Sequence, residues 1–279
     1  IIALVDRSIY SQSVCEHAAW LAERTGCSVE LMHVLGRREA GKDGDLSGAI
    51  ALGARTALLE ELAALDEQRA RLAISHGRAL LEDARAVFGD TGLEITEHLR
   101  HGDLMEAVAE KEADADLVLI GKRGEAADFA RGHLGSNLER VLRAATRPVF
   151  IASRAFKPIN SVLIAFDGSK SAMRAVEFVA QSPLYDGLSL SLVSAGEAGS
   201  DLKRQQAMAC ARLEQAGRTV IAQIIPGDPE TVIAALITQR DIGHLVMGAS
   251  GHSRLRTLFV GSTSLEMIRT CKVPILLVR

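Results

Sequence analysis

An internal repeat spans this chain and constrains its fold more than any other feature. Two of the matched segments are LVDRS at Leu4 with AFDGS at Ala165, and HGDLMEAV at His101 with PGDPETVI at Pro226. Two further pairs are DLVLIGKRG with HLVMGASG, and GSNLERVLRAATRPVFI with GSTSLEMIRTCKVPILL. Matched pairs in one order indicate a tandem duplication, so the chain must build one small fold twice.

Each half alternates short apolar runs with segments of helical spacing, a pattern typical of parallel βαβ units with right-handed crossovers. The predicted strands are 1–5, 28–35, 93–99, 116–120 and 148–152 in the first half, and 161–166, 188–193, 219–225, 245–247 and 274–278 in the second. We predict two domains, 1–154 and 158–279. A long helical segment, 50–88, has only a much shorter counterpart in the second half, and Gly77 weakens its helical pattern.

Composition excludes several classes of protein. A net charge of −3 over 279 residues gives no sign of a nucleic-acid-binding surface, and no apolar run is long enough to cross a membrane. The four cysteines form no metal-binding pattern, so we expect no metal site and free thiols in a cytoplasmic protein. Because the chain begins inside a predicted strand, we expect the native N-terminus to be missing.

Glycine-rich loops follow one strand in each half. In the second half Gly248 and Gly251 end the strand, and after nine intervening residues Gly261-Ser262-Thr263 opens a helix. Glycines let a ligand approach the backbone, and a helix start suits a phosphate. The alternative is an ordinary strand–loop–helix connection, in which such residues are common.

An aspartate ends the first strand of each half, Asp6 in one and Asp167 in the other. In parallel sheets ligands bind beyond the carboxyl ends of the strands, so each Asp should face the Gly-rich loop of its own half. The simpler alternative is a turn or cap residue, since Asp is common there. The recurrence of the arrangement favours a shared kind of ligand site.

These motifs together, the strand-end Asp, the G-D before the third helix and G-x2-G-x9-G-[ST], resemble the universal stress protein family in a tandem form. The resemblance implies an α/β fold of two tandem doubly wound domains, each with a five-stranded parallel sheet flanked by helices (adenine nucleotide alpha hydrolase-like). It also implies binding of ATP or AMP, and Mg²⁺ can accompany ATP.

The resemblance implies that the Asp contacts adenosine, that the end of the second strand lines the adenine pocket, and that the loop holds phosphates. In the second half the implied binding residues are Asp167, Gly168, Ser169, Val193, Met247, Gly248, Ser250, Gly251, His252, Gly261, Ser262 and Thr263. In the first half they are Asp6, Val34, Gly121, Arg123, Gly124, Gly135, Ser136 and Asn137.

The first half departs from the motif. Ten residues separate Gly124 from Gly135, and the basic pair Lys122-Arg123 stands where the second half has small residues. A basic side chain there can reach a phosphate, or it can fold across an empty pocket and pair with an acidic neighbour such as Asp6. We expect the second site to bind more tightly, with about one strong site per chain.

Three functions fit these features. The first is a nucleotide-dependent regulator or sensor in the stress response, for which we assign no catalytic residues. The second is a slow ATPase or self-phosphorylating protein that uses Ser262, Thr263 or His252. The third is a nucleotide-free interaction module that dimerises through the long helical segment. In each case we expect strands 148–152 and 274–278 to pair within the chain as a pseudo-dimer, and a homodimer stays open.

Overall fold

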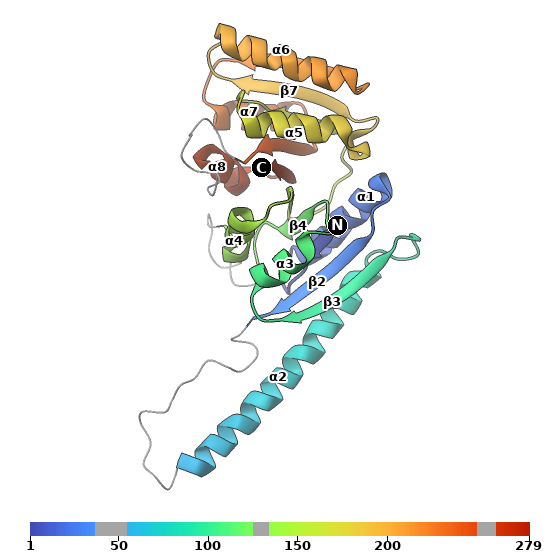
Figure 1. The fold of residues 1–279 in the computed structure, drawn as a ribbon, viewed down its shortest axis with the longest axis vertical. Helices are drawn as coiled ribbons and strands as arrows, with labels where there is room; N and C mark the ends of the chain where they lie inside the picture. Colours follow the sequence, from blue (N-terminus) through green and yellow to red (C-terminus); the bar gives the residue numbers. More distant parts are fainter. Residues whose placement is uncertain (37–54, 125–133, 250–260) are drawn as a thin grey trace.

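The computed structural model describes residues 1–36, 55–124, 134–249 and 261–279, and it contains one ten-stranded sheet (Figure 1). The strands are β1 (Ile2–Leu4), β2 (Val29–Leu35), β3 (Ile95–His101), β4 (Val118–Gly121), β5 (Val149–Ala152), β6 (Ser161–Ala165), β7 (Ser189–Ala195), β8 (Val220–Ile225), β9 (His244–Gly248) and β10 (Ile275–Val278). Their order is β3-β2-β1-β4-β5-β10-β9-β6-β7-β8. The sequence of neighbours in the first half thus recurs in the second, as the repeat predicts.

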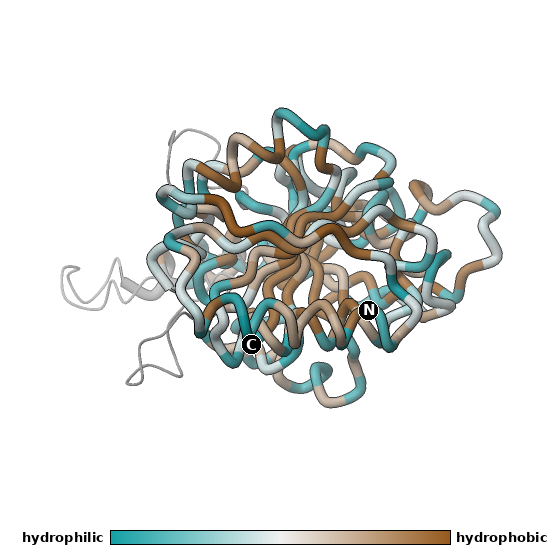
Figure 2. The backbone as a smooth tube through the Cα atoms, turned by 90° about the horizontal axis from the view of Figure 1, so that it is seen from above, coloured by the Kyte–Doolittle hydropathy of each residue, from teal (hydrophilic) through white to brown (hydrophobic). Residues whose placement is uncertain are grey.

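The described helices are α1 (Ser11–Thr25), α2 (Arg55–Ala86), α3 (Leu104–Glu112), α4 (Ser136–Ala144), α5 (Lys170–Gln181), α6 (Ser200–Gln215), α7 (Pro229–Gln239), α8 (Ser262–Thr270) and the short 3-10 turn Pro183–Tyr185. Buried side chains of α1, α2, α5 and α6 form one core on one face of the sheet. Those of α3, α4, α7 and α8 form a second core on the other face. Figure 2 shows the hydrophobic strands inside and hydrophilic segments around them.

All strand pairs within a half are parallel, and the two halves join where β5 runs antiparallel to β10. Phe150 lies opposite Leu276 at the centre of this seam, and both side chains are fully buried. The expected pairing of these two edge strands within the chain is therefore confirmed. It removes two edges that would otherwise expose unpaired backbone groups.

A stack of rings crosses the seam beside Phe150. The ring of His244 is stacked on it at 5.0 Å, and His17 lies at 5.5 Å from it. Tyr185 stacks on the other side of His244 at 6.1 Å. Burial lowers the pKa of His17 to about 4 and that of His244 to about 3, so both imidazoles are neutral at pH 7.

Helix α2 is 32 residues long, twice the length of α6. Its buried Gly77 packs closely on the sheet, because an added Cβ would come within 2.6 Å of the Leu99 side chain on β3 and would make that side chain shift. The glycine at which the helical pattern weakens thus lies where α2 approaches the sheet closely. Amino-terminal to this contact, α2 projects beyond the sheet (Figure 1).

Candidate functional site

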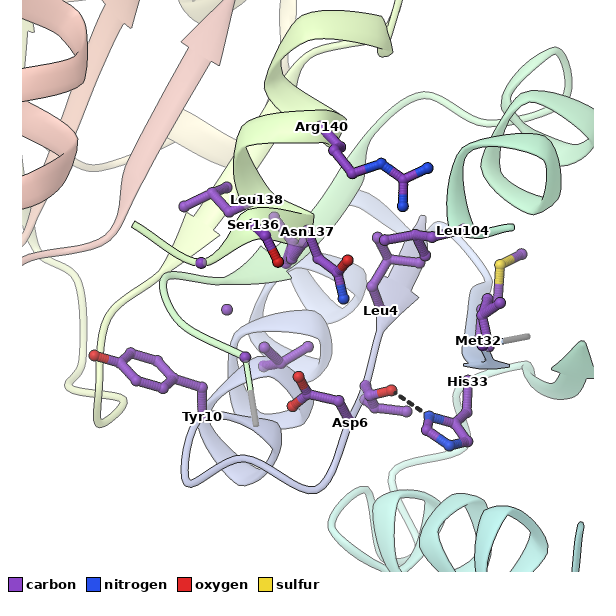
Figure 3. Close-up of a pocket in the computed structure, with 18 of the residues that line it drawn as sticks. Leu4, Asp6, Tyr10, Met32, His33, Leu104, Ser136, Asn137, Leu138 and Arg140 are labelled. Atoms are coloured by element: carbon purple, nitrogen blue, oxygen red, sulfur yellow. Dashed lines mark hydrogen bonds between the residues drawn. The ribbon is translucent and has the colours of Figure 1, made fainter. Parts of the chain in front are cut away.

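A cavity of about 640 Å³ opens at the carboxyl ends of β1 and β4 in the first half (Figure 3). These strands are neighbours from which the chain continues in opposite directions across the sheet, since β1 leads to β2 and β4 leads to β5. Such a switch point is where open α/β sheets bind ligands. All the site residues predicted for the first half line this cavity: Asp6, Val34, Gly121, Arg123, Gly124, Gly135, Ser136 and Asn137.

The carboxylate of Asp6 has two roles. Its Oδ1 accepts a hydrogen bond from the Ser8 backbone N–H at 3.0 Å, which closes a tight turn. Its Oδ2 faces Gly124 so closely that a Cβ on that residue would lie 2.9 Å away. Asp167 makes the same turn in the second half, where Oδ1 accepts from the Ser169 N–H at 2.9 Å. The turn interpretation and the site interpretation are therefore compatible.

The glycines of the first loop meet although their spacing is longer by one residue. A Cβ on Gly135 would lie 3.1 Å from the backbone nitrogen of Gly124, so the two backbones are in contact. The Gly135 N–H also bonds to the Lys122 carbonyl at 3.5 Å, and the Gly261 N–H makes the matching bond to Ala249 at 2.9 Å. The insertion thus leaves the helix start in the same place relative to the strand end.

Helix α4 presents its first N–H groups to the cavity. Its N-cap is Gly135, which supplies no side-chain hydrogen bond, whereas the N-cap of α3, Asp103, accepts from the N–H groups of Met105 and Glu106. Helix α8 likewise begins at a glycine cap, Gly261. An uncapped helix start with small neighbours is suited to an anion, because its N–H groups and dipole favour negative charge.

An arginine that the motif did not single out also lines the cavity. Arg140, on the second turn of α4, forms an ion pair with Asp103 and lowers the pKa of that carboxyl group (Figure 3). The pair links α3 to α4 at the rim. In the repeat Glu266 stands at the position of Arg140, and it pairs with Arg269 instead. Comparing charges between the two halves could have identified Arg140 from the sequence.

The two basic residues of the first loop separate. Lys122 points away from the cavity and donates from Nζ to the Cys271 carbonyl oxygen at 2.5 Å, across the seam at the end of α8. Burial lowers the pKa of Lys122 to about 8. Arg123 lines the cavity. One of the two alternatives was that a basic side chain folds across the pocket. Lys122 does not do so, and the cavity beside Arg123 is open.

The end of β2 forms one wall of the cavity, where Met32, His33 and Val34 line it. The His33 ring bonds through Nδ1 to the Val5 carbonyl oxygen at 2.9 Å, next to Val34. The Val5 N–H bonds to the Met32 oxygen, and the matching Phe166 N–H bonds to Val193. Val193 is thus the counterpart of Met32 and is buried in the core. The residue that corresponds to Val34 is Ala195, two positions further on.

The second site is described only in part. Asp167, Gly168, Ser169, Met247, Gly248, Gly261, Ser262 and Thr263 belong to the described chain, whereas Ser250, Gly251 and His252 lie outside it. Gly248 packs against the start of α5, where a Cβ would lie 2.6 Å from the Ala172 nitrogen. The Gln205 side chain on α6 lies against Gly168, which has a positive φ of 77°.

Comparison with known proteins agrees with this geometry. Residues 1–153 and 181–279 match the universal stress protein family. The chain is 33% identical over 284 residues to the universal stress protein Slr1230 of Synechocystis sp., covering all of this chain and 99% of that protein. The chain therefore belongs to the universal stress protein family. Its tandem form follows from the two matched segments and the repeated sheet.

Two solved structures share the whole fold. A universal stress protein from Archaeoglobus fulgidus is similar with a TM-score of 0.71 and 21% identity, over 100% of this chain and 97% of its own. A putative universal stress protein from Pseudomonas aeruginosa has a TM-score of 0.64 and 16% identity, over 99% and 91%. The predicted α/β fold with helices on both faces of a largely parallel sheet is thus confirmed.

None of the described helices is both long and apolar enough to cross a membrane. Within the same parts of the chain, no three His, Cys, Asp or Glu side chains gather as metal ligands would.

Proposed function

We propose that this protein binds ATP or AMP at the carboxyl edge of its half-sheets and acts in the stress response as a nucleotide-dependent regulator or sensor in the cytoplasm. The observation that carries the proposal is the meeting of Asp6, Gly124 and the uncapped start of α4 in one cavity. A carboxylate suits the hydroxyls of a ribose, and free helical N–H groups suit a phosphate.

The size and lining of the cavity support a nucleotide rather than a small anion. Its volume of about 640 Å³ lies in the range of about 300–1,000 Å³ typical of organic ligands. Apolar side chains such as Leu4 and Leu104 line it beside polar ones (Figure 3). An apolar wall beside a polar rim fits a flat base joined to a charged tail. With ATP, Mg²⁺ would be carried by the phosphates.

The proposal extends to both halves. The second half has the family spacing of its loop and an equivalent Asp turn, which is why we expect it to bind more tightly. The first half has an open cavity and two arginines at its lining, Arg123 and Arg140, which favour a phosphate. Which site is stronger stays a prediction, because the Gly251 segment is outside the described residues.

The test is calorimetric titration of the intact chain with ATP and with AMP, preceded by native mass spectrometry of the protein as purified. Gly124→Val places a branched side chain against the Asp6 carboxylate and should remove binding in the first half by about a hundredfold or more. Gly251→Val should do the same in the second half. Undiminished affinity in both single variants and in their combination would refute the proposal.

A further inference from the structure

The projecting part of α2 carries an apolar stripe that the fold leaves exposed. Leu58, Leu65 and Leu72 are exposed by 37%, 45% and 51%, and they recur every seven residues. Because a helix returns to nearly the same face after seven residues, the three side chains lie in one line. Leu62, half-buried, lies one turn from Leu58 and Leu65 on this side. We call Leu58, Leu62, Leu65 and Leu72 the leucine stripe.

Only the carboxyl-terminal part of α2 serves the fold of its own half. Leu81 and Ala84 are buried in the core, and Gly77 contacts β3. Leu58, Leu62 and Leu65 lie beyond that contact, on the segment that extends away from the sheet (Figure 1), whereas Leu72 borders a small cavity that His33 and Leu35 also line. An isolated helical segment of this length is only marginally stable in water, so a surface that covers the stripe would stabilise it.

We propose that a second copy of the chain covers the stripe, with the two α2 helices antiparallel about a twofold axis at Leu65. Leu65 then packs on the partner's Leu65. Leu58, seven residues before it, packs on the partner's Leu72, seven residues after it, and the reverse contact follows by symmetry. A twofold interface requires a surface that complements itself, and Leu58, Leu65 and Leu72 have that symmetry along the helix.

The charges of α2 favour the antiparallel direction. Glu61 and Arg69 lie four residues on either side of Leu65, so in the antiparallel pair Glu61 comes to the same level along the helix axis as the partner's Arg69, and the symmetry repeats this pair. In a parallel pair in register, Glu61 would face the partner's Glu61, and like charges repel. The Arg69 side chain is largely exposed, and its ion pair with Asp66 on the same helix is a long one at 3.9 Å. It can therefore also reach a carboxylate of the partner.

The other charged residues of α2 also favour an antiparallel partner. Acidic residues lie before the twofold point and just past it, at Glu60, Glu61, Asp66 and Glu67. Basic residues follow them, at Arg69, Arg71 and Arg78. An antiparallel partner therefore lays its basic part along the acidic part of α2. The shared segment from Leu58 to Leu72 is about 21 Å long at about 1.5 Å per residue, which keeps the two folded bodies at opposite ends.

The first experiment measures sedimentation of the full chain. The unaltered protein should be a dimer, and Leu65→Asp or Leu65→Lys alone should raise the dissociation constant by about a hundredfold or more, because each buries two like charges. An equal mixture of the two variants should dimerise again. Met208→Asp, at the exposed Met208 of α6, is the matched control and should leave the dimer unchanged.

A second experiment tests direction. With Cys27 and Cys210 replaced by serine, Leu65→Cys should form a disulfide-linked dimer on oxidation. Leu58→Cys should link to Leu72→Cys in a mixture but not to itself. Self-linking of Leu58→Cys would overturn the antiparallel pairing. A full chain that stays monomeric at all concentrations, with circular dichroism showing that the variants fold, would overturn the proposal altogether and leave the stripe to another occupant.

Discussion

The two halves share a scaffold but differ in the helix that crosses from their second to their third strand. This helix has 32 residues in the first half, α2, and 16 in the second, α6. Strand order and the Asp turn are nevertheless the same in both. The sheet depends only on the part of the crossover helix that packs on it, so the extra length projects without disturbing the fold.

The same comparison at the sites shows different charges around a helix start that keeps its place. The first cavity has Arg123 and Arg140 where the second half has Ser250 and Glu266. The bond between the helix-start glycine and the strand-end loop is present in both halves. Duplication thus preserved the position of the helix start and left the charges around it free to diverge.

The seam is also asymmetric in its side chains. His17 of α1 occupies the position that Phe178 holds in α5, and His244 of β9 occupies that of Leu117 before β4. Each half therefore contributes one buried imidazole that the other lacks. The ring nitrogen Nε2 of His17 is buried, and no partner for it is found among the described residues.

The largest effect should come from acid. Both imidazoles have a folded pKa below the unfolded value of about 6.5, so the unfolded chain binds more protons and stability falls as pH drops from about 6.5 towards 4 and 3. Each imidazole contributes about 1.4 kcal/mol for each pH unit between its unfolded and its folded pKa, so the combined loss of unfolding free energy is several kcal/mol. Urea denaturation at a series of pH values measures it.

The control for this prediction comes from the chain itself. His17→Phe installs the residue of the second half at the matching position and should flatten the acid dependence in part. His244→Leu should flatten it further. If both variants lose stability in acid as steeply as the unaltered chain, other groups are responsible.

The seam should be the next most sensitive place. Phe150→Ala removes a fully buried ring between the two halves and should cost about 3–5 kcal/mol in unfolding free energy. Leu276→Ala, at the residue opposite, should cost about 2–5 kcal/mol. Thermal or urea denaturation measures both. A cost below about 1 kcal/mol for Phe150→Ala would mean that the halves are stable apart.

Asp6→Asn and Asp167→Asn compare the two sites directly. The amide keeps the Oδ1 acceptor of the turn but removes the charge, so nucleotide affinity should fall by about 1–3 kcal/mol while stability changes little. Calorimetric titration of each variant gives the loss per half. An effect confined to one variant would identify the half that binds, and no effect in either would leave the carboxylates as turn residues only.

The smallest change is expected for Lys122→Ala, which gives the first half the residue of the second, Ala249. The bond from Lys122 to the Cys271 oxygen is lost, but the cost of burying the ammonium group is lost too. The net change in unfolding free energy should be within about 1 kcal/mol. A loss of about 3 kcal/mol or more would show that this bond is a principal link between the halves.

The sequence by itself determined the strands and the Asp turns. These depend on local patterns that the repeat presents twice: apolar runs, Asp followed two residues later by Ser, and a strand after a proline at each domain end. The backbone bonds of Val5 and Phe166 add the register between the halves, in which Val193 matches Met32 and Ala195 matches Val34.

Only the tertiary structure decided which distant side chains meet. Lys122 was expected near the cavity and instead bonds to Cys271, 149 residues later. Gly77 looked like a weak point in a helix until its distance to Leu99 showed a close contact with the sheet. A sequence pattern records which face of an element is apolar. Contacts across the seam and above the sheet also depend on how the elements pack, and no local pattern contains that information.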